Sequence, residues 1–380
     1  MSVADSCILA HNQAGAGGNV AGYARDMDVT GGAGEDSGRA AGLRMPAEWA
    51  PHERTLIAWP AREAAWRGTT IEQARDVHAQ VVAAIAAFEP VTLVVDPAHA
   101  DDARRRVSAE NVELLALPID DSWLRDSGPL IVTGPEGRRA GIDFRFNAWG
   151  EAFAPYDKDA AIARKLLDHL GIERFGSPMV LEGGAIAVDG TGRLVTTEQC
   201  LLNPNRNALL ERHEIEEELR VHLGAEQVVW LGRGLVEDAD TDGHVDNICA
   251  FLAPRRVLLQ TVVGEDDPNH PYAEENVRRL RDAGLEIERW ELLPRTTRAD
   301  GSVVAIPYTN LYLCNGAAIV PLGEQDPDMD AEALRRLNAL LPGREIVGVP
   351  GRVLALGGGG VHCITQQVPA DPARLALIAA

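Results

Sequence analysis

One arrangement recurs five times along this chain: an amphipathic helix, a tight turn and then a short strand. The helices are expected at residues 70–88, 158–170, 208–223, 273–283 and 330–341. In the first, apolar residues recur at helical spacing, and Thr70 and Gln73 can form a capping box at its start. Pro90 ends that helix, and glycines follow the other four, at Gly171, Gly224, Gly284 and Gly343. Glycine adopts the left-handed conformation that closes a helix, so each unit has a defined end.

Pairs of short strands are expected between these helices. They lie at 129–133 with 141–146, 185–189 with 193–197, 247–252 with 256–262, and 311–315 with 317–321. Recurrence of one supersecondary unit in fixed order is typical of a repeat architecture. The prediction is an α/β fold, a five-bladed pseudo-symmetric propeller of ββαβ modules that forms a single domain over residues 45–380. Because the units share negligible sequence identity, an irregular α/β domain stays open as the alternative. Residues 1–44 are rich in Gly and Ala and are expected to be a disordered extension.

The charge balance favours a small cationic ligand. The 380 residues carry 57 acidic and 36 basic side chains, a formal net charge of -21. Such a field disfavours nucleic acid and anionic membranes as partners. No apolar run approaches the roughly 18 residues of a membrane span, and no signal peptide is expected. Five scattered cysteines without a CxxC pair indicate neither a disulfide framework nor a cysteine zinc knuckle, which fits a reducing, cytoplasmic location.

Residues with reactive side chains fall at one recurring place, just before or entering the inner strand of a module. The four segments are residues 123–129, 180–184, 242–247 and 357–366. If the modules surround an axis, equivalent positions converge at its mouth. These segments are therefore predicted to meet in one pocket.

The last of these segments holds the candidate nucleophile, Cys363. An apolar run at 353–356 reads as a strand, four glycines follow, and the residues after them read as a strand again. Glycines allow a ligand to approach the backbone closely, so a cysteine after such a bend can face a cavity. A buried, inert cysteine is the other interpretation.

His244 and Asp246 are two residues apart, so in an extended chain both would face one ligand. His362 is adjacent to Cys363 and would face the opposite way in a strand, which makes His244 the better candidate to activate the thiol. Glu182, in an apolar setting, needs a partner and could orient His244. Asp126 could bind a ligand or only its own turn backbone. Trp123 could form a ligand wall or core.

Two chemistries can use these groups together. Histidine, cysteine and carboxylates can ligate zinc, although the spacings match no common site. Alternatively, carboxylates can hold a planar guanidinium, whose N–H donors match them in pairs. Asp126 and Asp246 would then present its central carbon to Cys363.

In several segments the chain resembles the agmatine deiminases of the Porphyromonas-type peptidylarginine deiminase family. The similarity runs from about Met45 to Pro369. The segments that carry it are 45–49 with 51–53, 121–129, 146–150, 181–184, 203–207, 242–247 and 361–367. One departure is Gly360, where the family commonly has Asn.

The resemblance implies the five-bladed pentein fold and hydrolysis of agmatine to N-carbamoylputrescine and ammonia, a reaction of putrescine biosynthesis. It places the amidino-cysteine nucleophile on Cys363 and the general acid/base on His244. Asp126 and Asp246 would bind the guanidinium, and Glu182 would support the histidine. Trp123 is a further candidate for contact with the substrate, apart from the resemblance. No metal or organic cofactor is expected.

Three alternatives remain open from the sequence. A deiminase could act on arginine or on peptidyl-arginine instead of agmatine. A non-catalytic propeller could serve as a binding module, and a zinc hydrolase could use the same side chains. The sequence also leaves open whether the chain is a monomer or a homo-oligomer.

Overall fold

The computed structural model describes residues 42–371, apart from the side chain of Glu136. Residues 1–41, most of the expected extension, therefore lie outside the described part of the chain. Folded contacts begin before residue 45: Leu43 is buried, and Arg44 pairs with Thr133 through two backbone hydrogen bonds.

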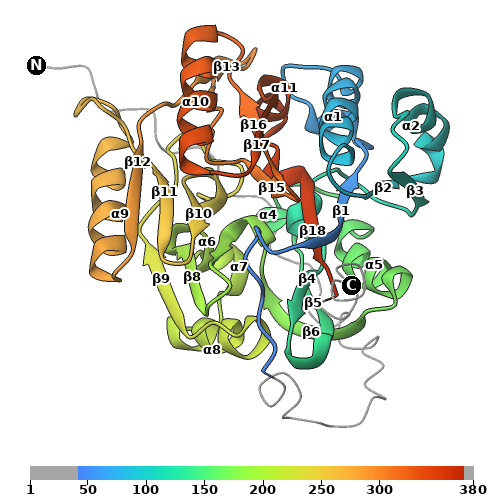
Figure 1. The fold of residues 1–380 in the computed structure, drawn as a ribbon, viewed down its shortest axis with the longest axis horizontal. Coiled ribbons are helices and arrows are strands. Elements are labelled where there is room, and N and C mark those ends of the chain that lie inside the picture. The colour runs from blue at the N-terminus through green and yellow to red at the C-terminus, as the bar shows by residue number, and fades with distance from the viewer. Residues whose placement is uncertain (1–41, 372–380) are drawn as a thin grey trace, which may run out of the picture. The chain divides into compact units, whose positions relative to one another are not determined.

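The α/β class is confirmed, and five modules share one strand order (Figure 1). In each, an antiparallel strand pair is followed by a helix and then by a strand parallel to the second one. Four modules are continuous in sequence. They are β4 (Leu130–Thr133), β5 (Arg139–Arg145), α5 (Ile162–Leu170) and β6 (Glu173–Val180); β7 (Ile186–Val188), β8 (Arg193–Thr197), α8 (Arg212–Leu223) and β9 (Gln227–Leu231); β10 (Cys249–Ala253), β11 (Arg256–Gln260), α9 (His270–Asp282) and β12 (Glu286–Trp290); and β15 (Tyr312–Cys314), β16 (Ala317–Leu322), α10 (Pro327–Leu340) and β17 (Glu345–Pro350).

The remaining module joins the two ends of the described chain. It contains β1 (His52–Ala58), α1 (Ile71–Ala86) and β2 (Val91–Val95), and it takes its antiparallel partner from the C-terminal strand β18 (Thr365–Pro369). Strand β3 (Val112–Ala116) pairs with β2 and extends this sheet, and α2 (Ala100–Arg106) lies between the two strands in sequence. The other modules described above have no counterpart of these two elements. The β1–β18 pairing links the first and last modules, as a ring of blades requires.

Local sequence explains where the helices begin and end. The capping box of α1 is present, with Thr70 and Gln73 bonded reciprocally. Gly171 and Gly224 adopt the left-handed conformation directly after α5 and α8, where a side chain would be strained. Each helix buries one apolar face; in α1 it is formed by Ala74, Val77, Val81, Val82 and Ile85. Figure 1 shows α1, α5, α8, α9 and α10 outside their sheets, with the short helices α4 (Ala148–Glu151), α6 (Glu198–Leu201) and α7 (Pro204–Asn207) nearer the middle.

The short elements include those that carry the candidate site. They are α3 (Leu124–Ser127), α4 (Ala148–Glu151), α6 (Glu198–Leu201), α7 (Pro204–Asn207), α11 (Arg352–Gly357), the hairpin β13 (Arg295–Thr297) and β14 (Val303–Ala305), and 3-10 turns that include η5 (Gly183–Ala185), η6 (Val245–Asn247) and η7 (His362–Ile364). The apolar run 353–356, expected as a strand, is the core of α11 instead. A short apolar run fits both structures, and Leu354, Ala355 and Leu356 are buried as part of this helix.

Across residues 42–371, no helix combines the length and apolar character that a bilayer span needs.

Candidate active site

The four predicted segments converge, each in a short turn before the first strand of a module. Asp126 lies in α3 before β4, Glu182 precedes η5 and β7, His244 precedes η6 and β10, and Cys363 lies in η7 before β18. The turn α3 contacts both η5 and η7, and η5 contacts η6, so all four turns are connected. Equivalent positions of different modules therefore bring together side chains that are far apart in sequence.

Gly184 lies at the point where these groups meet. A Cβ atom added there would lie 2.7 Å from His244 Nδ1 and 2.9 Å from both Asp126 Oδ1 and Asp246 Oδ2. Real Cβ atoms do not approach polar atoms so closely, so only glycine leaves this space free. The imidazole and both carboxylates thus border one small volume beside the backbone of Gly184.

Asp126 is held by two hydrogen bonds. The backbone N–H of Gly184 donates to Oδ1 at 2.9 Å, and the indole N–H of Trp149 donates to Oδ2 at 3.0 Å. Burial raises the pKa of Asp126 to about 6; the charge of His244 opposes this effect, while Asp246 and Glu182 add to it. Both partners come from other segments of the chain, whereas the turn interpretation would have paired the Asp126 carboxylate with its own backbone. A cation bound beside it would favour its ionised form.

Asp246 has one oxygen engaged and one without a partner. His362 Nδ1 lies 2.9 Å from Oδ2, and the same oxygen lies 3.6 Å from Cys363 Sγ. Oδ1 is buried and has no hydrogen-bond partner. Burial raises the pKa of Asp246, but hydrogen bonding and charge from His362 outweigh this effect, so the pKa lies below its usual value. An ionised carboxylate with one unpartnered oxygen thus lies beside the thiol.

Cys363 is 4% exposed, and its thiol contacts polar groups. Asn310 Nδ2 lies 3.3 Å from Sγ. Burial raises the pKa of the thiol well above its usual value, and Asp246 and Asp126 raise it further; the Gly360 backbone and Asn310 act in the opposite direction. Without a ligand, Cys363 is a thiol beside two carboxyl groups.

His244 is buried, and neither ring nitrogen has a hydrogen-bond partner. Nδ1 lies 3.9 Å from Asp126 Oδ1. Burial lowers the pKa of His244, but Asp126, Cys200 and Glu182 outweigh that effect and raise the pKa well above its usual value. The sequence pattern placed His244 and Asp246 in one extended segment. In the structure, the 3-10 turn η6 begins directly after His244 instead. Both residues nevertheless reach the space beside Gly184.

Glu182 lies close to His244 but is hydrogen-bonded elsewhere. Arg206 Nε donates to Glu182 Oε1 at 2.6 Å, and both side chains are fully buried. Oε2 has no hydrogen-bond partner. The partner that a buried carboxylate needs is therefore Arg206, which the sequence reasoning did not identify. Glu182 acts on His244 through its charge at this geometry.

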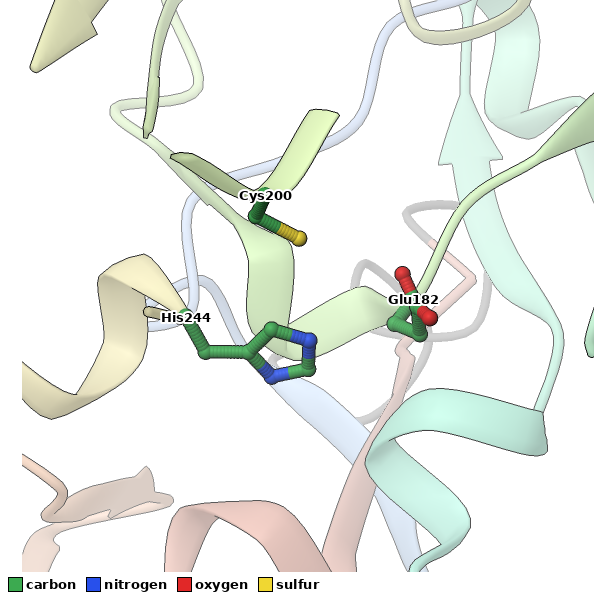
Figure 2. Close-up of side chains that lie close together, drawn as sticks. All are labelled: Glu182, Cys200 and His244. Carbon is green, nitrogen blue, oxygen red and sulfur yellow. The ribbon is translucent and has the colours of Figure 1, made fainter. Parts of the chain in front are cut away.

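Glu182, Cys200 and His244 also form a group with metal-ligating atoms (Figure 2), all within 4.8 Å of one another. Figure 2 shows the Cys200 sulfur and the Glu182 carboxylate on the same side of the imidazole ring. Zinc ligands stand about 2.0 to 2.3 Å from the metal, usually four in number. These three would have to move closer together, and the cationic Arg206 beside Glu182 opposes a second cation. The arrangement fits zinc poorly.

The ring nitrogens of His362 contact two carboxylates and not the Cys363 thiol. Its two nitrogens lie 2.9 Å from Asp246 Oδ2 and 2.8 Å from Glu48 Oε2. The prediction that His362 is a poor activator of the thiol assumed a strand; the residue lies in η7 instead, with strand β18 beginning at Thr365.

A narrow cavity is lined in part by Cys363 and Asp126. Its walls include Trp123, Trp149 and Phe153, together with Asp121 and Asp240. Trp123, predicted as either ligand wall or core, is 7% exposed and lines this cavity. The sequence reasoning did not assign Trp149 or Asn310 to the site, although Trp149 lies in one of the family-like segments.

Gly360 is closely covered by Asn310. A Cβ atom at position 360 would lie 2.3 Å from Asn310 Oδ1. Asn310 Oδ1 also accepts the backbone N–H of His362 at 3.0 Å. The asparagine that is common in the family at position 360 would therefore require Asn310 to move in this chain.

Comparison with known proteins places this site in context. A model of the Porphyromonas-type peptidyl-arginine deiminase family matches residues 44–369. The agmatine deiminase of Ectopseudomonas mendocina is 41% identical over 360 residues, covering 87% of this chain and 97% of that protein. The structure of Enterococcus faecalis agmatine deiminase superposes with a TM-score of 0.80 at 31% identity, covering 87% of this chain and 96% of that one. A C. jejuni agmatine deiminase with substrate bound gives a TM-score of 0.80 at 26% identity, covering 87% and 97%.

Proposed function

This chain belongs to the Porphyromonas-type peptidyl-arginine deiminase family, and we propose that it hydrolyses agmatine to N-carbamoylputrescine and ammonia through a covalent intermediate on Cys363. Relatives about 40% identical over most of the chain are named agmatine deiminases. The observation that carries the proposal is the placement of the Cys363 thiol 3.6 Å from Asp246, with Asp126 and His244 around the same space beside Gly184.

Asp126 and Asp246 hold the guanidinium of the substrate in this proposal. Asp246 Oδ1 is buried without a partner, and an N–H of the substrate would satisfy it. Asp126, already fixed by Gly184 and Trp149, would accept from another edge of the group. A planar cation with several N–H donors matches two carboxylates at its edges.

Substrate binding also promotes ionisation of the nucleophile. Burial and the two neighbouring carboxyl groups raise the pKa of Cys363. A bound guanidinium adds a positive charge beside the sulfur and satisfies both carboxylates, so it lowers that pKa and favours the thiolate. The reactive thiolate is thus formed mainly when a cationic substrate is present.

The chemistry proceeds in two halves. The thiolate attacks the central guanidinium carbon, forming a C–S bond; the C–N bond then breaks, and His244 gives a proton to the departing ammonia. The product of this half is a thiouronium ester on Cys363. His244 next takes a proton from water, whose oxygen attacks the same carbon, and the C–S bond breaks to release the ureido product. The raised pKa of His244 keeps it protonated for the first half. Glu182, through its charge, helps to hold that proton.

The cavity favours agmatine over arginine. Trp123, Trp149 and Phe153 offer apolar surface for a methylene chain, and Trp123 contacts the substrate in this proposal. Free arginine would bring an α-carboxylate to a cavity that also contains Asp121 and Asp240. Arg67 and Arg298 lie nearby, but both are paired with Asp240, at 2.7 and 2.9 Å. Asp240 therefore offsets part of the positive charge that a carboxylate would need.

The test compares guanidine substrates directly. Purified protein is incubated with agmatine, arginine and an arginine-containing peptide, and both ammonia and ureido product are measured. Cys363→Ser serves as the inactive control, and Cys200→Ser tests a second buried thiol. We expect turnover of agmatine by the wild type and none by Cys363→Ser. Absence of turnover with every guanidine would refute the enzymatic proposal, and turnover of arginine alone would refute the choice of substrate.

The cellular setting follows from the same account. A cytoplasmic location is proposed because agmatine is a small metabolite and the four cysteines in the described residues, Cys200, Cys249, Cys314 and Cys363, are free thiols. The net charge of -21 argues against nucleic acid as a partner.

A further inference from the structure

His362, the residue before the nucleophile, lies between two carboxylates. Nδ1 is 2.9 Å from Asp246 Oδ2, and Nε2 is 2.8 Å from Glu48 Oε2. A neutral imidazole has one N–H and can donate to only one of them. The other ring nitrogen would then place its lone pair against a carboxylate oxygen. Only the doubly protonated imidazolium can donate to both.

The groups around His362 favour the doubly protonated form of its ring. Glu48 is fixed by the backbone N–H of Leu313, which donates to Oε1 at 2.7 Å, and Arg125 Nη2 lies 3.5 Å from Oε2. Burial raises the pKa of Glu48, but His362 and Arg125 outweigh it and lower the pKa to about 2. For His362, burial and Arg125 lower the pKa, and Glu48 and Asp246 outweigh them and raise it. Cys363 is a thiol without substrate and adds no charge.

The contact with His362 determines which oxygen of Asp246 is left for a ligand. His362 engages Oδ2, the oxygen that borders the space beside Gly184, and leaves Oδ1 buried and without a hydrogen-bond partner. His362 also receives support from behind: its backbone N–H donates to Asn310, and its carbonyl accepts from Arg125 Nε at 3.3 Å. A side chain fixed at both ends in this way can fix the carboxylate it touches.

We propose that His362 is a permanent imidazolium that positions Asp246 and keeps it ionised, with Glu48 as the residue that holds the imidazolium in place. This proposal deepens the proposed function, because it rests on Asp246 being the group that binds the guanidinium. His362 is a positioning residue: it acts on the substrate through Asp246 and takes no part in proton transfer at the reacting carbon.

The decisive variant is His362→Asn in a Cys363→Ser background, in which agmatine binds without reacting. Asparagine carries no charge and cannot donate to both carboxylates, so Asp246 loses the charged hydrogen bond that fixes it. We expect agmatine to bind about 10- to 150-fold more weakly, the range for losing a hydrogen bond to a charged group. Glu48→Gln should change the affinity in the same direction and less. His213→Asn, at an exposed site on α8, should leave binding unchanged.

A second measurement separates positioning from a merely structural role. Without the imidazolium, the pKa of Asp246 rises, so the loss of agmatine affinity on acidification should begin at higher pH in His362→Asn than in its parent. Nitrogen NMR of the ¹⁵N-histidine-labelled protein should show both ring nitrogens of His362 protonated at pH 8. A neutral tautomer there, or unchanged affinity and unchanged pH dependence in His362→Asn, would overturn the proposal. If the Cys363→Ser protein does not bind agmatine at all, the proposed function fails, while the NMR measurement still decides the state of His362.

Discussion

The Sγ atom of Cys363 lies 3.6 Å from Oδ2 of Asp246, a carboxylate that is itself bonded to His362. An anion at this distance opposes loss of the thiol proton. The same carboxylate is the proposed ligand of the cationic substrate. In this proposal, one residue suppresses ionisation of the nucleophile when the site is empty and binds the ligand that favours it.

Asp246→Asn should make the free thiol more acidic while impairing catalysis. Removing the anion lowers the pKa of Cys363, so alkylation of this cysteine by iodoacetamide should begin at lower pH than in the wild type. Loss of one charged hydrogen bond to the guanidinium should lower kcat/KM for agmatine about 10- to 150-fold. Mass spectrometry of the peptide that contains Cys363 reports the first effect. Asp282→Asn, on the exposed surface of α9, is the control. A higher alkylation pH in Asp246→Asn would contradict the electrostatic argument.

The acid limb of the pH profile should depend on Asp126. Burial raises the pKa of Asp126 to about 6, so kcat/KM should rise with pH as this group ionises and fall below about pH 6. Trp149 donates to the ionised form, and Trp149→Phe should therefore move the limb to higher pH. Trp230 donates its indole N–H to Glu216 away from the site. Trp230→Phe should therefore leave the acid limb unchanged. An identical limb in Trp149→Phe and wild type would show that another group controls it.

The buried pair of Arg206 and Glu182 should dominate the stability of this region. Arg206→Met leaves a buried carboxylate without its cation, a change that typically costs about 3–5 kcal/mol of unfolding free energy. Arg278→Met breaks an exposed pair with Asp282, where about 0–1 kcal/mol is expected. Urea denaturation of both variants measures the difference. Equal losses would mean that the Arg206 pair is not protected from water as the structure describes.

Gly360→Ala should disturb the nucleophile through Asn310. The new Cβ would lie 2.3 Å from Asn310 Oδ1, so the carboxamide must leave its place beside Cys363. We expect lower kcat with agmatine and a higher alkylation pH for Cys363, because a hydrogen bond to the sulfur is lost. Gly264→Ala, which meets no atom within 4 Å, is the matched control. Normal kcat in Gly360→Ala would exclude a role for the carboxamide.

The modules were predictable because their signals are local. The capping box at Thr70 and the glycines at 171 and 224 mark helix ends through short-range hydrogen bonds and backbone conformation. The run at 353–356 was misassigned because four apolar residues fit a strand and a helix equally well. The pairing of β1 with β18 joins segments more than 300 residues apart, and no local pattern encodes it.

The candidate site was also predictable only in part. Residue type and family-like segments identified Cys363, His244, Asp126, Asp246, Glu182 and Trp123, and the structure brings all six to one region. Their partners were not predictable. Arg206 reaches Glu182 from α7, and Glu48 reaches His362 from a segment 314 residues away. Such pairs depend on how the modules pack.

Mass spectrometry of the protein quenched during turnover tests the central claim most directly. His244→Asn should slow both the formation and the hydrolysis of the intermediate, so the adduct is followed over time in this variant and in wild type after mixing with agmatine. The account predicts that the peptide containing Cys363 gains the mass of agmatine less ammonia, while the peptides containing Cys200, Cys249 and Cys314 stay unmodified. Release of ammonia from agmatine with no adduct on Cys363, or with an adduct on another residue, would contradict it.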